Sequence, residues 1–205
     1  MISRVIRVAV FSTVVGVTAC SPQQSEPEPA GQEISAVTAE TDIATLRRLA
    51  MQGNPAAQYL LGDRYQYGKG VAPDNTQAAA WYQQAADQGH SDAQTGLAIM
   101  YQLGLGVPKD YAQALVWFQK SADQGTARAQ LNIGFLHRDG QGVAQDYAEA
   151  HKWLSLAAAR ALPASQRTYA ETRDALAEEM TPSQTAEARK RTAEWQADFE
   201  KRQAD

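Results

Sequence analysis

The sequence has a single cysteine and only three histidines among its 205 residues. One cysteine cannot form an intramolecular disulfide and cannot build a cysteine-based zinc cage. The histidines, His90, His137 and His151, lack the four-residue spacing with which one helix presents two ligands to a metal ion. No serine stands in the Gly-x-Ser-x-Gly motif of a nucleophile elbow. We therefore expect no metal ion, no cofactor and no catalytic centre.

Positive charge is also scarce. The chain carries 19 lysines and arginines against 23 aspartates and glutamates, which gives a formal net charge of -4. Neutralisation of phosphates by Lys and Arg supplies most of the affinity of nucleic-acid-binding proteins, so this balance excludes nucleic acid as a partner. Three Gly-x-Gly pairs are present, but none follows a predicted strand or has the full spacing of a nucleotide fingerprint. We expect no small-molecule substrate.

Apolar runs are short. The run from Val8 to Ala19 does not reach the about 20 residues that a membrane-spanning helix needs. It follows Arg4 and Arg7, and a basic segment before a short apolar one is typical of an export signal.

That run ends in Val17-Thr18-Ala19-Cys20, which resembles the lipobox of bacterial lipoproteins. The resemblance implies a lipoprotein signal peptide over 1–19, cleavage before Cys20 and acylation of that cysteine, which attaches the protein to the membrane. Ser21 at the next position favours the outer membrane by the same resemblance. An ordinary secretory signal and an uncleaved short anchor are the alternatives. Residues 20–39, rich in Pro, Glu and Gln, lack apolar periodicity and are predicted to form a disordered tether.

The rest of the chain repeats with a period of 36 residues. A period of this size indicates stacked helical repeats, in which a residue recurs because packing requires it in every copy. The pattern is Gly68, Gly70, Val71, Asp74, Ala78, Trp81, Ala86 and Gly89 in the first copy, Gly104, Gly106, Val107, Asp110, Ala114, Trp117, Ala122 and Gly125 in the second, and Gly140, Gly142, Val143, Asp146, Ala150, Trp153 and Ala158 in the third.

Each copy is predicted to form two antiparallel helices. In the first copy, Asn54-Pro55 is a favourable start for helix A, and Gly68 ends that helix. Asp74, with Gln77 three residues later, is close to a capping box and starts helix B. Trp81 falls on the same face of helix B as alanines, so we expect the recurring tryptophans to be core residues.

The spaced positions of the first copy resemble the Sel1-like repeat, a relative of the tetratricopeptide repeat. The matching residues are Ala57, Leu61, Gly62, Tyr65, Gly68, Gly70, Val71, Asp74, Ala78 and Trp81. Mild departures in the other copies are Ala98, Ser121, His137 and Ala161. The resemblance implies an all-α fold, a right-handed α-solenoid of helix-turn-helix repeats that serves as an adaptor.

Capping segments flank the three repeats in the predicted organisation. The segment 40–53 is an N-terminal half-repeat, the repeats cover 54–89, 90–125 and 126–161, and capping helices fill 162–205. Thr181-Pro182-Ser183-Gln184 is a capping box that starts the last helix. In that helix a stripe of Ala188, Thr192, Trp195 and Phe199 has the spacing to dock on the solenoid.

Residues that differ between the copies are the better candidates for partner binding. Our hypothesis is that an apolar strip of Ile99, Leu103 and Phe135, flanked by charges, lies on the concave surface formed by the A helices. The alternative, that these side chains pack between neighbouring A helices, remains open. The full candidate set is Tyr59, Asp63 and Tyr67 in the first copy, Ile99 and Leu103 in the second, and Phe135, Arg138 and Asp139 in the third.

Together these features predict a non-enzymatic adaptor, anchored in the outer membrane through acylated Cys20 and facing the periplasm, that binds another protein of the cell envelope. A peptidoglycan- or β-lactam-directed enzyme is one alternative, although the relatives with that activity carry paired cysteines that this chain lacks. A structural cell-wall tether is another.

Overall fold

The computed structural model describes residues 37, 38 and 40–204. The predicted signal peptide (1–19), Cys20 with its lipid and most of the predicted tether (20–39) lie outside the described residues. Within the described part, the chain forms nine helices and no strand. They are α1 (Ile43–Met51), α2 (Pro55–Tyr67), α3 (Asn75–Asp87), α4 (Ser91–Leu103), α5 (Tyr111–Ala122), α6 (Ala127–Asp139), α7 (Tyr147–Arg160), α8 (Pro163–Glu178) and α9 (Pro182–Ala204).

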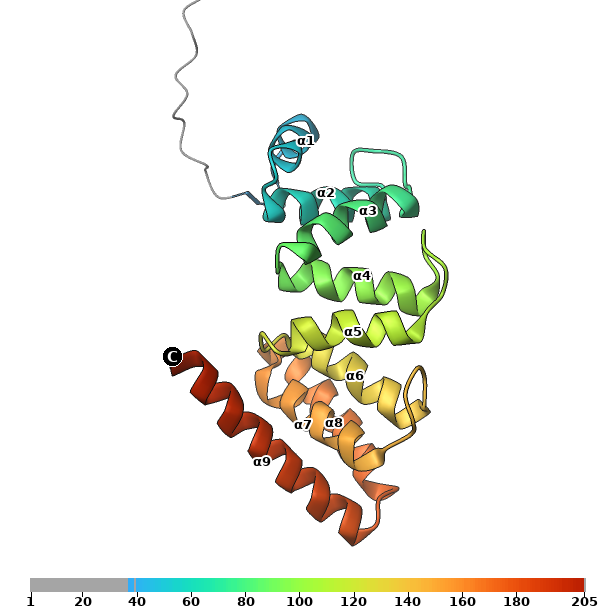
Figure 1. The fold of residues 1–205 in the computed structure, drawn as a ribbon, viewed down its shortest axis with the longest axis vertical. Coiled ribbons are helices and arrows are strands. Elements are labelled where there is room, and N and C mark those ends of the chain that lie inside the picture. Colours follow the sequence, from blue (N-terminus) through green and yellow to red (C-terminus); the bar gives the residue numbers. More distant parts are fainter. Residues whose placement is uncertain (1–36, 39, 205) are drawn as a thin grey trace, which may run out of the picture. The chain divides into compact units, whose positions relative to one another are not determined.

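Three helical hairpins, α2–α3, α4–α5 and α6–α7, stack in chain order (Figure 1), and each helix packs on the one before it. The first helices of the hairpins begin at Pro55, Ser91 and Ala127, each 36 residues after the one before. The loops that follow α2, α4 and α6 lie along the same edge of the stack in Figure 1. The predicted all-α solenoid is confirmed.

Helix ends follow the predicted capping chemistry. Asp110 Oδ1 accepts hydrogen bonds from the amides of Ala112 and Gln113, at 2.9 and 3.0 Å, and thereby satisfies two amides that a helix start leaves unpaired. Asp74 caps α3 in the same way, whereas Asp146 accepts from the single amide of Glu149 at the start of α7. The amide of Asp74 donates to the carbonyl oxygen of Tyr65 at 2.9 Å, and not to Gln77 as in a complete capping box. The first helices of the hairpins end at glycines in the left-handed region, which is the conformation that a helix-ending glycine favours.

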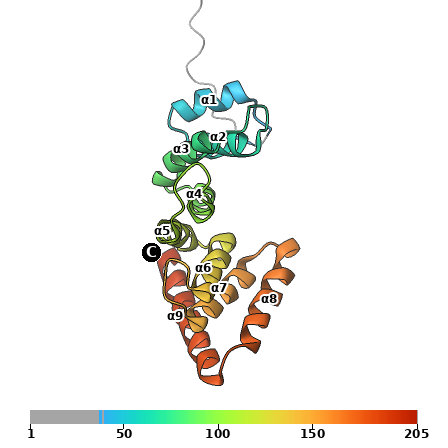
Figure 2. The ribbon, with the colours of Figure 1, turned by 90° about the vertical axis from the view of Figure 1, so that its right-hand side faces the viewer.

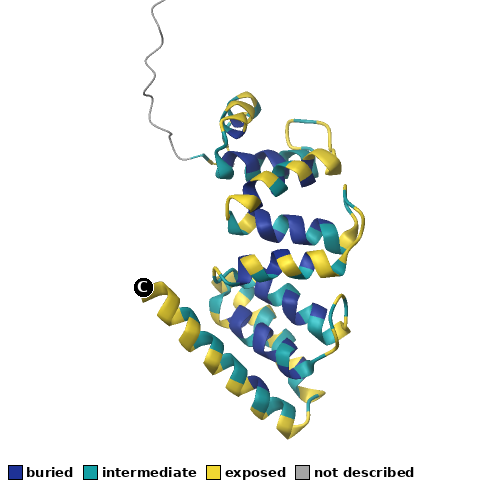
Figure 3. Ribbon diagram, viewed as in Figure 1, coloured by how far each residue is buried: buried dark blue, intermediate teal, exposed yellow. Residues whose placement is uncertain are grey.

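Buried residues run through the whole stack (Figure 3), and they include small side chains such as Ala93 and large ones such as Phe118, both fully buried. Trp117 and Trp153 are 7% and 2% exposed, which confirms the prediction that they are core residues. Trp81 is only partly buried, packed against the first core cluster, so the prediction does not hold for the first copy. Gly62 lets α3 approach closely, since a Cβ there would lie 2.7 Å from the ring of Tyr82. In the third hairpin Gly134 has the same relationship to Leu154.

Both ends of the stack carry extra helices. At the start α1 packs on α2, and at the end α8 and α9 both pack on α7. Figure 2 shows α8 and α9 diverging from their common turn at residues 179–181. The predicted capping box is present, because the Thr181 amide donates to Gln184 Oε1 at 2.8 Å and the Gln184 amide donates to Thr181 Oγ1 at 3.3 Å.

Candidate interaction surfaces

The C-terminal ends of α2 and α4 carry two exposed apolar side chains at equivalent positions. Tyr67 is 57% exposed and Leu103 is 59% exposed, whereas most large apolar side chains of the stack are covered. Lys69 Nζ lies 2.9 Å from Asp63 Oδ2 and 5.0 Å from the centre of the Tyr67 ring, so it holds these two predicted residues on one face. Both contacts are solvent-exposed, and each contributes less than about 1 kcal/mol.

The equivalent end of α6 is charged. Arg138 donates to both carboxylate oxygens of Asp139, at 2.7 and 3.1 Å, and its guanidinium lies 4.9 Å from the centre of the Phe135 ring. The hydrogen bond from Arg138 to Asp139 raises the pKa of Arg138. Arg138 and Asp139 therefore form a bidentate pair at the end of α6, the position that Tyr67 and Leu103 occupy in the earlier copies.

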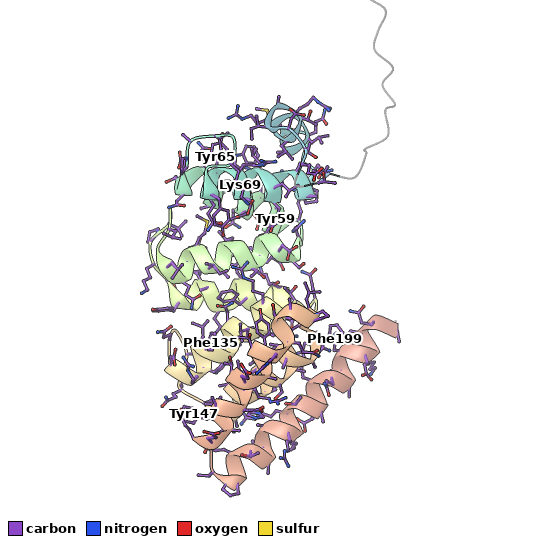
Figure 4. The ribbon with its side chains drawn as sticks, turned by 180° about the vertical axis from the view of Figure 1, so that it is seen from behind. Tyr59, Tyr65, Lys69, Phe135, Tyr147 and Phe199 are labelled. Carbon is purple, nitrogen blue, oxygen red and sulfur yellow. The ribbon has the colours of Figure 1, made fainter. Side chains whose placement is uncertain are left out.

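Three members of the predicted set are packing residues in the structure. Tyr59 stacks between the rings of Tyr82 and His90, at centroid distances of 5.8 and 4.9 Å. Ile99 packs against the central core cluster. Phe135 packs instead against the separate cluster that contains Leu176 of α8. Figure 4 shows Tyr59 and Phe135 at different levels of the stack.

Two members of the predicted strip therefore lie in different clusters, Ile99 against the central one and Phe135 against the one formed by Ala150, Leu154 and Leu176. Phe135 thus packs on side chains of α7 and α8, and not between neighbouring A helices as the open alternative had it. Four of the predicted residues, Tyr67, Leu103, Arg138 and Asp139, keep substantial exposure at the helix ends. Asp63 lies one turn before Tyr67 with its side chain 22% exposed, and we call these five residues the helix-end surface.

A glutamine ladder connects successive hairpins. Gln94 Nε2 donates to the carbonyl oxygen of Ala86 at 3.1 Å, and Gln94 Oε1 accepts from Gln124 Nε2 at 2.8 Å. Gln58 makes the equivalent bonds to Ala50 and Gln88, at 3.1 and 2.6 Å. The sequence contained the signal for this ladder, since the glutamines recur with the 36-residue period.

The third rung is incomplete. Gln130 is fully buried and donates to Ala122 at 3.4 Å, but its Oε1 has no hydrogen-bond partner. The residue that stands where Gln88 and Gln124 stand in the other copies is Arg160. Its guanidinium lies 4.8 Å from the centre of the Trp195 ring and 4.7 Å from that of Phe199, both on α9.

A charged cluster fixes the first half of α9 to α7. Arg191 Nη1 lies 2.9 Å from Asp146 Oδ2 and 3.2 Å from Glu149 Oε2, and Arg191 Nε lies 2.8 Å from Glu187 Oε1. Glu149 also accepts hydrogen bonds from Lys152 and from Trp153 Nε1. Burial raises the pKa of Glu149, but the hydrogen bonds from Lys152 and Arg191 outweigh it and leave the pKa below its ordinary value.

The three histidines have separate structural environments. His90 is the N-cap of α4, where Nδ1 accepts from the Ala93 amide at 3.3 Å, a role that the sequence analysis missed. His137 lies at an open pocket of about 580 Å³ that Asp146 and Gln184 also line, and its Nδ1 is buried without a partner. Among residues 37, 38 and 40–204, no group of three His, Cys, Asp or Glu side chains has the geometry to hold a metal ion.

A search of the described helices finds none that combines the length and the apolar character required to cross a membrane. The stacked hairpins, glycine loops and aspartate caps define a helical-repeat protein of the tetratricopeptide type. More narrowly, residues 55–90, 91–126 and 127–162 each match the Sel1 repeat, which accounts for more than half of the chain. The chain therefore belongs to the Sel1 repeat family, whose members usually mediate protein–protein interactions.

Two solved structures are similar to this chain. A Sel1 repeat protein from Oxalobacter formigenes shares 37% identity with a TM-score of 0.55, over 58% of this chain and 49% of that one. The protein c5321, a protective antigen present in uropathogenic Escherichia coli strains, shares 42% identity with a TM-score of 0.56, over 58% of this chain and 26% of that one. The match thus spans about half of the first protein and a quarter of the second. No curated protein matches the chain.

Proposed function

We propose that this protein is an adaptor that binds another protein of the cell envelope through the helix-end surface. The observation that supports the proposal is the exposure of Tyr67 and Leu103 at equivalent places on the first helices of successive hairpins, at 57% and 59%. Neither side chain belongs to a core cluster. Exposed apolar side chains with charged ones beside them are typical of a protein contact.

The chemistry of the helix-end surface suggests its partner. The Asp63–Lys69 pair lies on one side of the apolar residues, and the Arg138–Asp139 pair lies on the other. A partner segment with apolar side chains between charged ones complements this arrangement. Rim charges of this kind contribute more to specificity and association rate than to affinity.

A photo-crosslinking amino acid at position 103 tests this proposal in the native envelope. Position 116 is the matched control, because Val116 is a 49% exposed apolar side chain on α5, away from the helix-end surface. We expect a discrete protein adduct from position 103, none from position 116, and loss of the adduct when Tyr67→Glu is added. Equal adducts from both positions would count against the helix-end surface.

Attachment to the outer membrane through acylated Cys20, with the repeats facing the periplasm, is part of the same proposal. The supporting observation is the lipobox-like Val17-Thr18-Ala19-Cys20 after a short apolar run, with Ser21 next. Several acyl chains hold a protein on a membrane far more firmly than one. In cells fed an alkyne fatty acid, Cys20→Ala should lose the label and move to the soluble fraction; retention of label would exclude this cysteine as the anchor.

Sel1 repeat proteins are generally non-catalytic, which agrees with an adaptor. The enzyme alternative predicts turnover of nitrocefin or of muropeptides by the purified chain, and robust turnover would replace the adaptor proposal. The cell-wall tether predicts retention of the purified chain on isolated sacculi. Either assay uses the same protein as the crosslinking experiment.

A further inference from the structure

Helix α9 lies along α7 as an addition to the repeat stack (Figure 1), and few of its own residues are buried there. Among its described residues only Ala188 is buried, while Trp195 and Phe199 keep partial exposure. Most of the helix is exposed in Figure 3. Elements with little buried apolar surface open at lower free energy than the core, so α9 is suited to detach from the repeat stack.

The face of α7 beneath α9 has three binding features. Asp146 and Glu149 supply carboxylates that hold Arg191 at 2.9 and 3.2 Å. One turn further along, Trp153 meets the ring of Trp195 edge to face, with the centroids 5.7 Å apart. At the far end, the Arg160 guanidinium covers the Trp195 and Phe199 rings, which stack on each other at 4.9 Å. We call these four α7-side residues, Asp146, Glu149, Trp153 and Arg160, the α7 face.

The third rung of the glutamine ladder carries an unpaired acceptor. Arg160 stands at the ladder position whose occupants, Gln88 and Gln124, donate to the glutamine of their own hairpin. The guanidinium of Arg160 lies against the α9 rings instead, and the buried Oε1 of Gln130 has no partner. A buried acceptor without a donor costs free energy that pairing would recover. Two sets of partners therefore compete for the guanidinium of Arg160.

We propose that the α7 face is a helix-binding site that α9 occupies within its own chain, and that Arg160 turns to Gln130 Oε1 when the site is empty. The partner that fits is an α-helix of another protein with arginine, tryptophan and phenylalanine at successive four-residue intervals. This is the pattern of Arg191, Trp195 and Phe199, which lie on one face of a helix. The site is separate from the helix-end surface, so either proposal stands if the other fails.

The test uses full-length chains and a fluorescent peptide that spans residues 181–205. In the wild-type chain α9 is joined to α8 by a short turn at residues 179–181, which gives it an effective concentration on the order of millimolar. Micromolar peptide should therefore not enter the site. The Trp195→Ala/Phe199→Ala chain, whose own α9 lacks both rings, should bind the peptide at least about tenfold more tightly than the wild type does.

Two controls define the site. Glu194→Ala changes an exposed residue of α9 whose ion-pair partner, Lys190, is on the same helix at 4.0 Å. This variant should keep α9 on the α7 face and bind no more peptide than the wild type does. Adding Glu149→Gln to the Trp195→Ala/Phe199→Ala chain should weaken peptide binding, because a carboxylate for the peptide arginine is lost. If the Trp195→Ala/Phe199→Ala chain keeps its circular dichroism spectrum and binds no more peptide than the wild type, the proposal is overturned.

Two substitutions at position 160 test whether Arg160 turns from the α9 rings to Gln130 when α9 leaves. Arg160→Gln restores the residue of the other copies, so it should release α9 while amide protection at the junction of α5, α6 and α7 is kept or increased. Arg160→Ala should release α9 and also lower protection at that junction, because Gln130 gains no donor. Hydrogen exchange resolved by peptide measures both effects. Equal losses at the junction in the two variants would show that Arg160 only fills space, and would overturn the switch.

Discussion

A Cβ atom on Gly106 would lie 2.1 Å from the backbone carbonyl oxygen of Asn75, the first residue of α3. The glycine loop after α4 therefore rests directly on the start of the preceding hairpin's second helix. Gly142 has the same relationship to the backbone of Tyr111 in α5. Gly70 meets nothing within 4 Å. In the second and third loops the second glycine thus allows close contact with the preceding repeat. The first loop has a glycine at the same position, Gly70, but makes no such contact there.

Gly106→Ala should destabilise the protein more than Gly70→Ala. Both glycines have positive φ angles, 70° and 80°, so an alanine at either position strains the backbone by about 1 kcal/mol. At Gly106 the overlap with backbone atoms adds about 1 to 3 kcal/mol, as overpacking of a core does. Urea unfolding of the two variants gives the difference. Equal decreases in the free energy of unfolding would mean that the close contact at Gly106 does not add to the destabilisation.

Gln124→Leu should reproduce in the second hairpin the unpaired acceptor found in the third. The change removes the donor to Gln94 Oε1, an atom of a side chain that is only 4% exposed. An unpaired buried acceptor costs about 1 to 3 kcal/mol. Gln83→Leu is the control, since Gln83 bonds Asp87 on the exposed surface and should change the free energy of unfolding by less than about 0.5 kcal/mol. Similar decreases in the free energy of unfolding in both variants would show that the glutamine ladder does not stabilise the protein.

The sequence was sufficient for the repeats because each recurring residue has a local or nearest-neighbour cause. Asp110 caps the helix that follows it, and Gly104 ends the helix that precedes it. Such effects act within one unit, and repetition shows them three times. The stripe of Ala188, Trp195 and Phe199 was also visible in the sequence, because its spacing is that of one helix face. The residues of α7 on which it docks were not.

The candidate site was harder to predict because it depends on what lies over each residue. Phe135 is equivalent to Ile99, but it packs against a different cluster, one that includes Leu176 of α8, and no helix-period pattern reveals that neighbour. The change from glutamine to Arg160 was visible, yet its meaning required the rings of Trp195 and Phe199 to be nearby. Departures from a repeat show where to look, and only the packing shows what the departure does.

Mild acid should destabilise the protein through its histidines. Burial lowers the pKa of His90, His137 and His151 below the ordinary 6.5. Near that pH the unfolded chain binds protons that the folded chain does not, so the free energy of unfolding falls as the pH drops below about 6.5. Carboxylates with lowered pKa values, such as that of Glu149, reduce the free energy of unfolding further only at lower pH.

His137→Tyr isolates one of these groups and restores the residue type of Tyr65 and Tyr101 at the equivalent positions. We expect the free energy of unfolding to depend less steeply on pH between about 6.5 and 5 in this variant, because one titrating group is gone. Urea unfolding at several pH values compares the slopes, and the comparison does not depend on how well the tyrosine packs. An unchanged slope would show that His137 binds protons equally in both states.

Arg191→Met should loosen α9 without disturbing the repeats. The side chain of Arg191 is 33% exposed and that of Asp146 is 39% exposed, so solvent screens the pairs, and we expect a loss of only about 1 kcal/mol. That loss corresponds to about a fivefold faster hydrogen exchange of the α9 amides. Arg189→Met is the control, because Arg189 is an exposed arginine on the same helix. The difference between the two variants should shrink in 1 M salt, where charge interactions at this exposure are screened. A difference that persists undiminished in salt would mean that Arg191 holds α9 by packing of its aliphatic stem, and not by its ion pairs with Asp146 and Glu149.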